Sequence, residues 1–220
     1  MFPSGNNVPQ RPQETNEKHI PRILWIAVRE QEDAKPDNQP RHMKDLFDRN
    51  KNWDIRLVWN EEKDRFMNTT FAGTSLLWAY HAINPVCGAA KADIWRYAVL
   101  WIFGGVYIDD DSDMIAPLDD VVTKSDYLIA AFEKNGFNGN RCFVPRYHLS
   151  DFSTFDRFSN ISVIPEAARK EFQFVILNWA IMAAPRHLMM EHAMRNLVEV
   201  VRYEYLREEV MRNLNAEYGW

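Results

Sequence analysis

Three consecutive aspartates, Asp109, Asp110 and Asp111, follow a short apolar run at residues 106–108. Such a run is typical of a buried strand, and carboxylates that follow it lie at the end of the sheet where α/β proteins bind ligands. Residues two apart on an extended segment point to the same side, so Asp109 and Asp111 are expected to share a face. Carboxylate oxygens suit Mg²⁺ or Mn²⁺ and leave coordination positions for substrate phosphates. An isolated acidic cluster can also be a solvated turn.

A second pair of charges, Asp93 and Arg96, lies on the segment just before this strand. Residues 85–103 have a helical pattern that is apolar on nearly every side, which indicates a buried helix. Asp93 and Arg96 are three residues apart and are therefore neighbours on its surface. Buried charges must be paired, hydrogen-bonded or engaged with a ligand, because unpaired burial is costly. A structural ion pair and a ligand-binding role are both compatible with this pattern.

The elements that position these residues alternate between strand and helix, which favours the α/β class. A strand, a helix and a strand in the first 60 residues predict a crossover unit of a parallel sheet. The long helix is expected to stop at Gly104-Gly105. The expected elements are strands at 20–28, 53–59, 106–108 and 127–132, loops at 29–40 and 133–160, helices at 42–50 and 85–103, an apolar segment at 174–184 and a helix or helix pair at 186–214.

The composition is that of an ordinary globular domain, with 46% hydrophobic and 26% charged residues in a chain of 220. We expect a disordered polar leader at 1–18 and a single domain at 19–220. The leader contains no apolar stretch that could cross a membrane, so the chain as given is expected to be soluble, either cytoplasmic or a luminal domain without its anchor. A net charge of −5 argues against a nucleic-acid partner. Two cysteines are too few for a disulfide framework.

The residues around both charge clusters resemble a known family signature. This signature belongs to glycosyltransferases with a DXD-containing sugar-binding region, which form family 32, and the clostridial glucosylating toxins share it. The central match consists of Ala90-Lys91-Ala92-Asp93-Ile94-Trp95-Arg96-Tyr97, Leu100 and Gly104-Gly105-Val106-Tyr107-Ile108-Asp109-Asp110-Asp111. Weaker matches are Ile20-Pro21-Arg22-Ile23 near the start, and Asn178 with Ala184-Pro185-Arg186-His187 near the end.

The resemblance implies a GT-A-type nucleotide-sugar-binding fold with a mixed, mostly parallel sheet flanked by helices. It implies retaining transfer of a hexose-type sugar from a nucleotide-diphosphate sugar, with UDP favoured over GDP, to a hydroxyl of a glycan or other acceptor. The implied cofactor is Mn²⁺ or Mg²⁺.

The resemblance also implies residue roles. Asp111 would bind the metal, and Asp109 would contact the metal and the ribose of the donor. Asp93 and Arg96 would hold the donor sugar and the oxygens near its phosphate. The other implied donor-binding residues are Tyr107, Asn178 and Trp25, with Trp25 facing the base.

Two other classes share part of the acidic pattern. A haloacid-dehalogenase-type phosphatase also ends a strand in Asp-x-Asp, but its motif stands near the start of the domain, whereas Asp109 and Asp111 are in the middle of the chain. A calcium loop would need a glycine directly after Asp113 and a glutamate at its closing position, and the chain has neither. A catalytically inactive module that binds metal and sugar remains an alternative, and it would bind the donor without transferring it.

Overall fold

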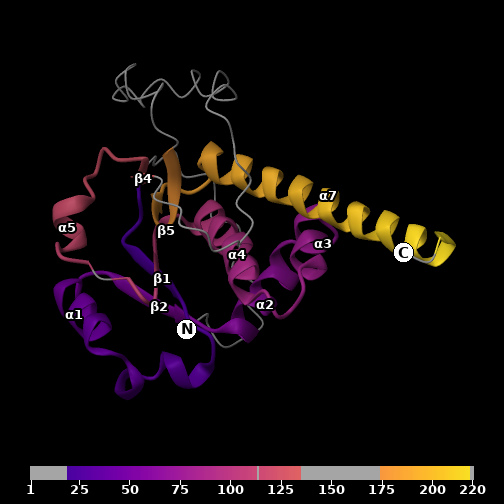
Figure 1. Ribbon diagram of the computed structural model, residues 1–220. Helices are drawn as coiled ribbons and strands as arrows, with labels where there is room; N and C mark the ends of the chain where they lie inside the picture. Colours follow the sequence, from indigo (N-terminus) through magenta and orange to yellow (C-terminus); the bar gives the residue numbers. More distant parts are fainter. Residues whose placement is uncertain (1–18, 113, 135–173, 219–220) are drawn as a thin grey trace. The chain divides into compact units, whose positions relative to one another are not determined.

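The computed structural model describes residues 19–112, 114–134 and 174–218 (Figure 1). The predicted leader at 1–18 and nearly all of the predicted irregular segment at 133–160 lie outside these ranges. The chain divides into two compact units, one formed by residues 1–129 and 178–220 and the other by residues 130–177. The single domain at 19–220 stays a prediction.

A five-stranded mixed sheet confirms the α/β class, with the strand order β2-β1-β3-β5-β4. β1 pairs in parallel with both β2 and β3, whereas β5 runs antiparallel to β3. The parallel pairing of β1 with β2 confirms the predicted crossover unit. The strands are β1 (Ile23–Ala27), β2 (Asp54–Val58), β3 (Gly105–Asp109), β4 (Leu128–Lys134) and β5 (Phe174–Ala183).

The helices include two that the sequence pattern did not predict, α2 (Asn60–Thr70) and α3 (Ser75–Ala82). α2 buries Glu62 and Lys63 among its core-facing residues, so its apolar pattern is weak. The predicted loop at 29–40 is wrong in part, because the 3-10 helices η1 (Gln31–Ala34) and η2 (Pro36–Asn38) form within it. The remaining helices are α1 (Arg41–Arg49), α4 (Gly88–Phe103), α5 (Leu118–Val121) and α7 (Leu188–Tyr218).

Two hydrophobic clusters cover the two faces of the strands β1, β3 and β5. Trp25, Tyr107 and Ile181 belong to the cluster that α2, α3, α4 and α7 complete, whereas Leu24 and Ile108 belong to the cluster that contains residues of α1 and α5. In Figure 1, α1 and α5 lie on one side of these strands and α2, α3, α4 and α7 on the other. This division follows from the alternation of side chains along a strand. α4 buries seven of its residues, which confirms the predicted buried helix.

The turn from α4 into β3 requires two glycines. Gly104 and Gly105 have φ angles of 66° and 107°, a backbone region that side chains with a Cβ avoid. A Cβ on Gly105 would lie 2.6 Å from the carbonyl oxygen of Ile23. The turn therefore lets β3 pair closely with β1 directly after the helix, and it fixes Asp109 at the end of β3.

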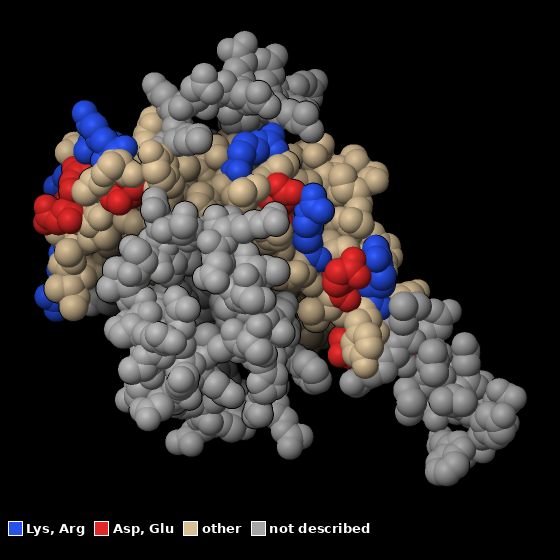
Figure 2. All heavy atoms as spheres, turned by 90° about the horizontal axis from the view of Figure 1, so that it is seen from above, with Lys and Arg blue, Asp and Glu red and all other residues tan. Residues whose placement is uncertain are grey.

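The surface carries charges of both signs. Figure 2 shows acidic and basic side chains of the described residues interspersed over one face. Across residues 19–112, 114–134 and 174–218, no helix is both long enough and apolar enough to span a bilayer.

Candidate active site

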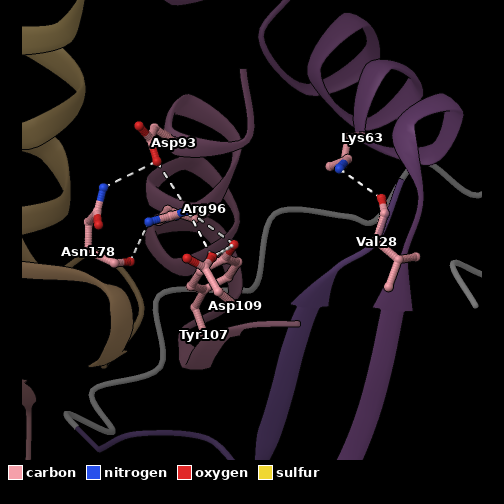
Figure 3. Close-up of polar contacts among 7 residues, drawn as sticks. All are labelled: Val28, Lys63, Asp93, Arg96, Tyr107, Asp109 and Asn178. Carbon is pink, nitrogen blue, oxygen red and sulfur yellow. Dashed lines mark hydrogen bonds and ion pairs between the residues drawn. The ribbon is translucent and has the colours of Figure 1, made fainter. Parts of the chain in front are cut away.

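The guanidinium group of Arg96 is the centre of a polar cluster that joins α4, β3 and β5 (Figure 3). Arg96 is only 4% exposed. Its Nη2 lies 3.0 Å from Oδ1 of Asp109 and 3.1 Å from Oδ1 of Asp93, and it donates to the hydroxyl of Tyr107 at 3.2 Å. Its Nη1 donates to the backbone oxygen of Asn178 at 2.5 Å. One buried cation therefore binds two carboxylates, and the predicted proximity of Asp93 and Arg96 is confirmed.

Tyr107 and Asn178 complete the cluster from the two strands. The Tyr107 hydroxyl donates to Oδ1 of Asp109 at 2.5 Å, and its ring lies under the Arg96 guanidinium at 4.4 Å. The Asn178 amide donates to Oδ1 of Asp93 at 3.3 Å. Every member of the cluster thus contacts at least two others, which fixes the direction of the Asp109 side chain.

Burial and charge shift the pKa values of these groups. Burial raises the pKa of the Asp93 carboxyl, and the negative charge of Asp109 adds to the rise although Arg96 opposes it. Burial alone would lower the pKa of Arg96, but Tyr107, Asp93 and Asp109 outweigh it and raise that pKa. Arg96 is therefore a permanent positive charge beside the end of β3.

A pocket of about 310 Å³ opens beside this cluster, and the described residues that border it are Asp109, Asp111, Ser112 and Trp179. Asp109 ends β3, and Asp111 and Ser112 belong to the turn that follows. Asp111 is exposed, whereas Asp109 is half-buried because Arg96 and Tyr107 cover one side of it. Asp109 and Asp111 thus border a single pocket, but Asp111 lies in a turn, so the extended segment from which a shared face was predicted ends at Asp109.

The two carboxylates fit a divalent cation. Arg96 and Tyr107 both bind Oδ1 of Asp109, and no described residue makes a hydrogen bond to its Oδ2. Within the described ranges, no group of three or more His, Cys, Asp or Glu side chains is arranged to hold a metal ion. An ion here would therefore take one or two protein carboxylates and fill its coordination shell with water and phosphate oxygens, as Mg²⁺ commonly does. Asp113 lies outside the described residues.

Trp25 does not join the other predicted site residues. Its side chain is 0% exposed, its Nε1 donates to the carbonyl oxygen of Gly104 at 2.9 Å, and its ring packs against Trp95 and Phe103. Contact with a nucleotide base would require this ring to leave the core. The structure thus gives no support to the prediction that Trp25 faces the base.

Sequence reasoning did not find Ser112, Trp179 or Lys63. Ser112 and Trp179 border the pocket, and the signals available were that Ser112 directly follows Asp111 and that Trp179 directly follows Asn178. Lys63 of α2 is 6% exposed and donates to the carbonyl oxygen of Val28, just beyond β1, at 3.0 Å (Figure 3). Burial lowers the pKa of Lys63 to about 8, although Asp110 and Asp64 oppose the shift. No pattern in the sequence distinguished this lysine from a surface one.

Comparison with protein families gives an independent result. Residues 36–128 match the family described as the glycosyltransferase sugar-binding region containing the DXD motif. The matched range contains Asp93, Arg96, Tyr107, Asp109 and Asp111 and ends before β5. The comparison with curated proteins gave no match. Across residues 36–128, the chain is therefore similar to the glycosyltransferase sugar-binding regions that contain a DXD motif.

Proposed function

We propose that the protein is a metal-dependent glycosyltransferase that moves a hexose-type sugar from a nucleotide-diphosphate sugar to a hydroxyl of a glycan or another acceptor. UDP is the nucleotide we favour, and GDP is the second choice. The observation that carries the proposal is that Asp109 and Asp111 border one pocket, while the buried cation Arg96 forms an ion pair with Asp109. The pocket provides carboxylate ligands for a divalent ion, and Arg96 adds a fixed positive charge next to it.

The residues of the chain have separate tasks in this proposal. Asp111 and the uncommitted Oδ2 of Asp109 would hold Mn²⁺ or Mg²⁺. When bound, the ion would stabilise the negative charge that develops on the leaving diphosphate. Arg96 adds a positive charge held by four groups, so no reorganisation is needed when that charge forms. Its buried Nε has no hydrogen-bond partner among the described residues, and an oxygen of the donor is the acceptor we propose for it.

Retention of configuration is part of the proposal and can be achieved in two ways. A covalent intermediate needs a carboxylate nucleophile in addition to the metal ligands. Among the described residues, the carboxylates that border the pocket are Asp109 and Asp111, and both are assigned to the metal. We therefore favour attack by the acceptor hydroxyl on the same face of the sugar from which the diphosphate leaves.

Isothermal titration of UDP and GDP, with and without Mn²⁺, tests the proposal. The variants are Asp111→Asn and the matched control Asp120→Asn, which removes an exposed carboxylate of α5. We expect the wild type and the control to bind one nucleotide in a Mn²⁺-dependent manner, and Asp111→Asn to bind it at least about tenfold more weakly. Equal binding by both variants, or no binding by the wild type with any metal, would refute the proposal.

A transfer assay then separates an enzyme from an inactive binding module. The protein is incubated with UDP-hexose and Mn²⁺, and both transfer to an acceptor and slow hydrolysis of the donor are followed. Hydrolysis or transfer that is lost in Asp111→Asn supports an enzyme. Tight Mn²⁺-dependent binding without either reaction would support the inactive metal- and sugar-binding module.

A further inference from the structure

Trp179 is an aromatic residue at the edge of the acidic pocket. It is 39% exposed, although Ile181 and Ala183, which follow it on the same face of β5, are fully buried. It borders the pocket together with Asp109, Asp111 and Ser112. The indole therefore provides the single large apolar surface among the described residues that line this pocket.

The sheet fixes Trp179 next to Asp109. β3 and β5 pair antiparallel, with Tyr107 opposite Ile181 and Ile108 opposite Ala180, so one further step of this register brings Asp109 opposite Trp179. Side chains directly opposite each other on antiparallel strands lie on the same face of the sheet and within reach of one another. The backbone before Trp179 is also held, because the Asn178 carbonyl oxygen accepts a hydrogen bond from Arg96. The indole is therefore positioned by the same cluster that positions the Asp109 carboxylate.

A pocket with carboxylates on one side and an indole on another has the chemistry of a sugar site. The hydroxyl groups of a pyranose need hydrogen-bond acceptors, and its C–H groups form an apolar face that can lie flat on an aromatic ring. We propose that Trp179 packs against a pyranose ring held beside Asp109 and Asp111 and so contributes to the choice of sugar. This inference rests on the proposed glycosyltransferase function and adds to it a sugar-contacting residue.

The pyranose can belong to the donor or to a glycan acceptor, because both sugars meet at the reacting atoms. If it belongs to the donor, Trp179 contributes to the affinity for UDP-hexose and not to the affinity for UDP. If it belongs to the acceptor, Trp179 affects the KM for the acceptor and leaves donor hydrolysis unchanged. Covering about half of the exposed indole removes roughly 50 Å² of apolar surface from water, which corresponds to about tenfold in affinity.

The test compares Trp179→Ala and Trp179→Phe with a matched control, Trp78→Ala. Trp78 is also 39% exposed, but it lies on α3, where its ring contacts Tyr205. Binding of UDP and of UDP-hexose is titrated in the presence of Mn²⁺, and the KM for the acceptor and the rate of donor hydrolysis are measured in parallel. Retained UDP binding shows that each variant is folded around the metal site.

We expect Trp179→Ala to lose about tenfold in affinity for UDP-hexose or in acceptor KM, Trp179→Phe to lose less, and both to bind UDP as the wild type does. The control should match the wild type in every measurement. If the wild type binds UDP-hexose and transfers the sugar while Trp179→Ala equals it, the inference is refuted and the proposed function stands. The inference is also refuted if UDP binding falls as much as UDP-hexose binding. A wild type that binds no nucleotide refutes the proposed function and this inference together.

Discussion

Replacing Arg96 with methionine is expected to lower the free energy of unfolding by about 3 kcal/mol at pH 7. Methionine keeps most of the apolar stem of the side chain, so the main loss is the charge and its hydrogen bonds. In the variant, Asp93 and Asp109 would face each other without the cation that now lies within about 3 Å of both. Removing one partner of a buried ion pair usually costs about 3–5 kcal/mol. We expect the lower end because the two carboxylate side chains are 32% and 30% exposed, so water can solvate them in part.

Urea unfolding followed by tryptophan fluorescence measures this loss, and Arg195→Met is the matched control. Arg195 also pairs with a carboxylate, Glu191 on α7, but its side chain is 73% exposed. Exposed pairs of this kind contribute at most about 0.5 kcal/mol. If Arg96→Met and Arg195→Met lose the same free energy, then the buried cluster does not stabilise the protein as we argue.

The double variant Arg96→Met with Asp93→Asn gives a second test of the same reasoning. It removes one of the two carboxylates that are left without a cation, so it should recover part of the lost stability relative to Arg96→Met alone. If the free-energy changes of the two single variants simply add in the double variant, the charges do not interact in the way that the distances indicate.

Three further predictions concern other parts of the structure. Burial lowers the pKa of Lys63 to about 8 from the ordinary 10.5, so the unfolded chain binds this proton more tightly than the folded chain does. The free energy of unfolding should therefore rise by up to about 3 kcal/mol between those pH values. Lys63→Met should show a smaller rise in the same urea titrations. The pKa of Asp93 is raised, so ionisation of its carboxyl lowers the free energy of unfolding increasingly as pH rises above the ordinary 3.8. The stability of Asp93→Asn relative to the wild type should therefore increase from pH 4 to pH 7. Gly105→Ala should lower the free energy of unfolding by about 3 kcal/mol or more, measured by thermal unfolding, because its Cβ would collide with the Ile23 carbonyl at a positive φ. Gly73→Ala is also at a positive φ but in open space, so it should lower the free energy of unfolding by less. Equal losses at the two glycines would show that the contact with Ile23 is unimportant.

The local sequence was sufficient to predict the elements that carry the central motif. The buried helix at 85–103 appears as α4, its predicted stop at Gly104-Gly105 forms the turn, and the strand that follows ends at Asp109. These features depend on apolar periodicity, glycine and short spacings, all of which act between residues close in the chain. The same signals failed for α2, because a helix that buries Glu62 and Lys63 does not show a clear apolar stripe.

The tertiary structure decided which residues meet at the pocket. The hydrogen bond from Arg96 to Asn178 joins residues that are 82 positions apart in the sequence. Trp179 borders the same pocket as Asp109 because β5 pairs with β3. Trp25 illustrates the reverse case, since the resemblance suggested a ligand contact and packing buried the ring completely. Contacts between distant segments leave no period in the local sequence, and they depend on strand order and register. The sequence by itself thus determined the acidic motif and the helix beside it. Only the fold determined that Arg96 contacts Asp109 and that Trp179 borders the same pocket.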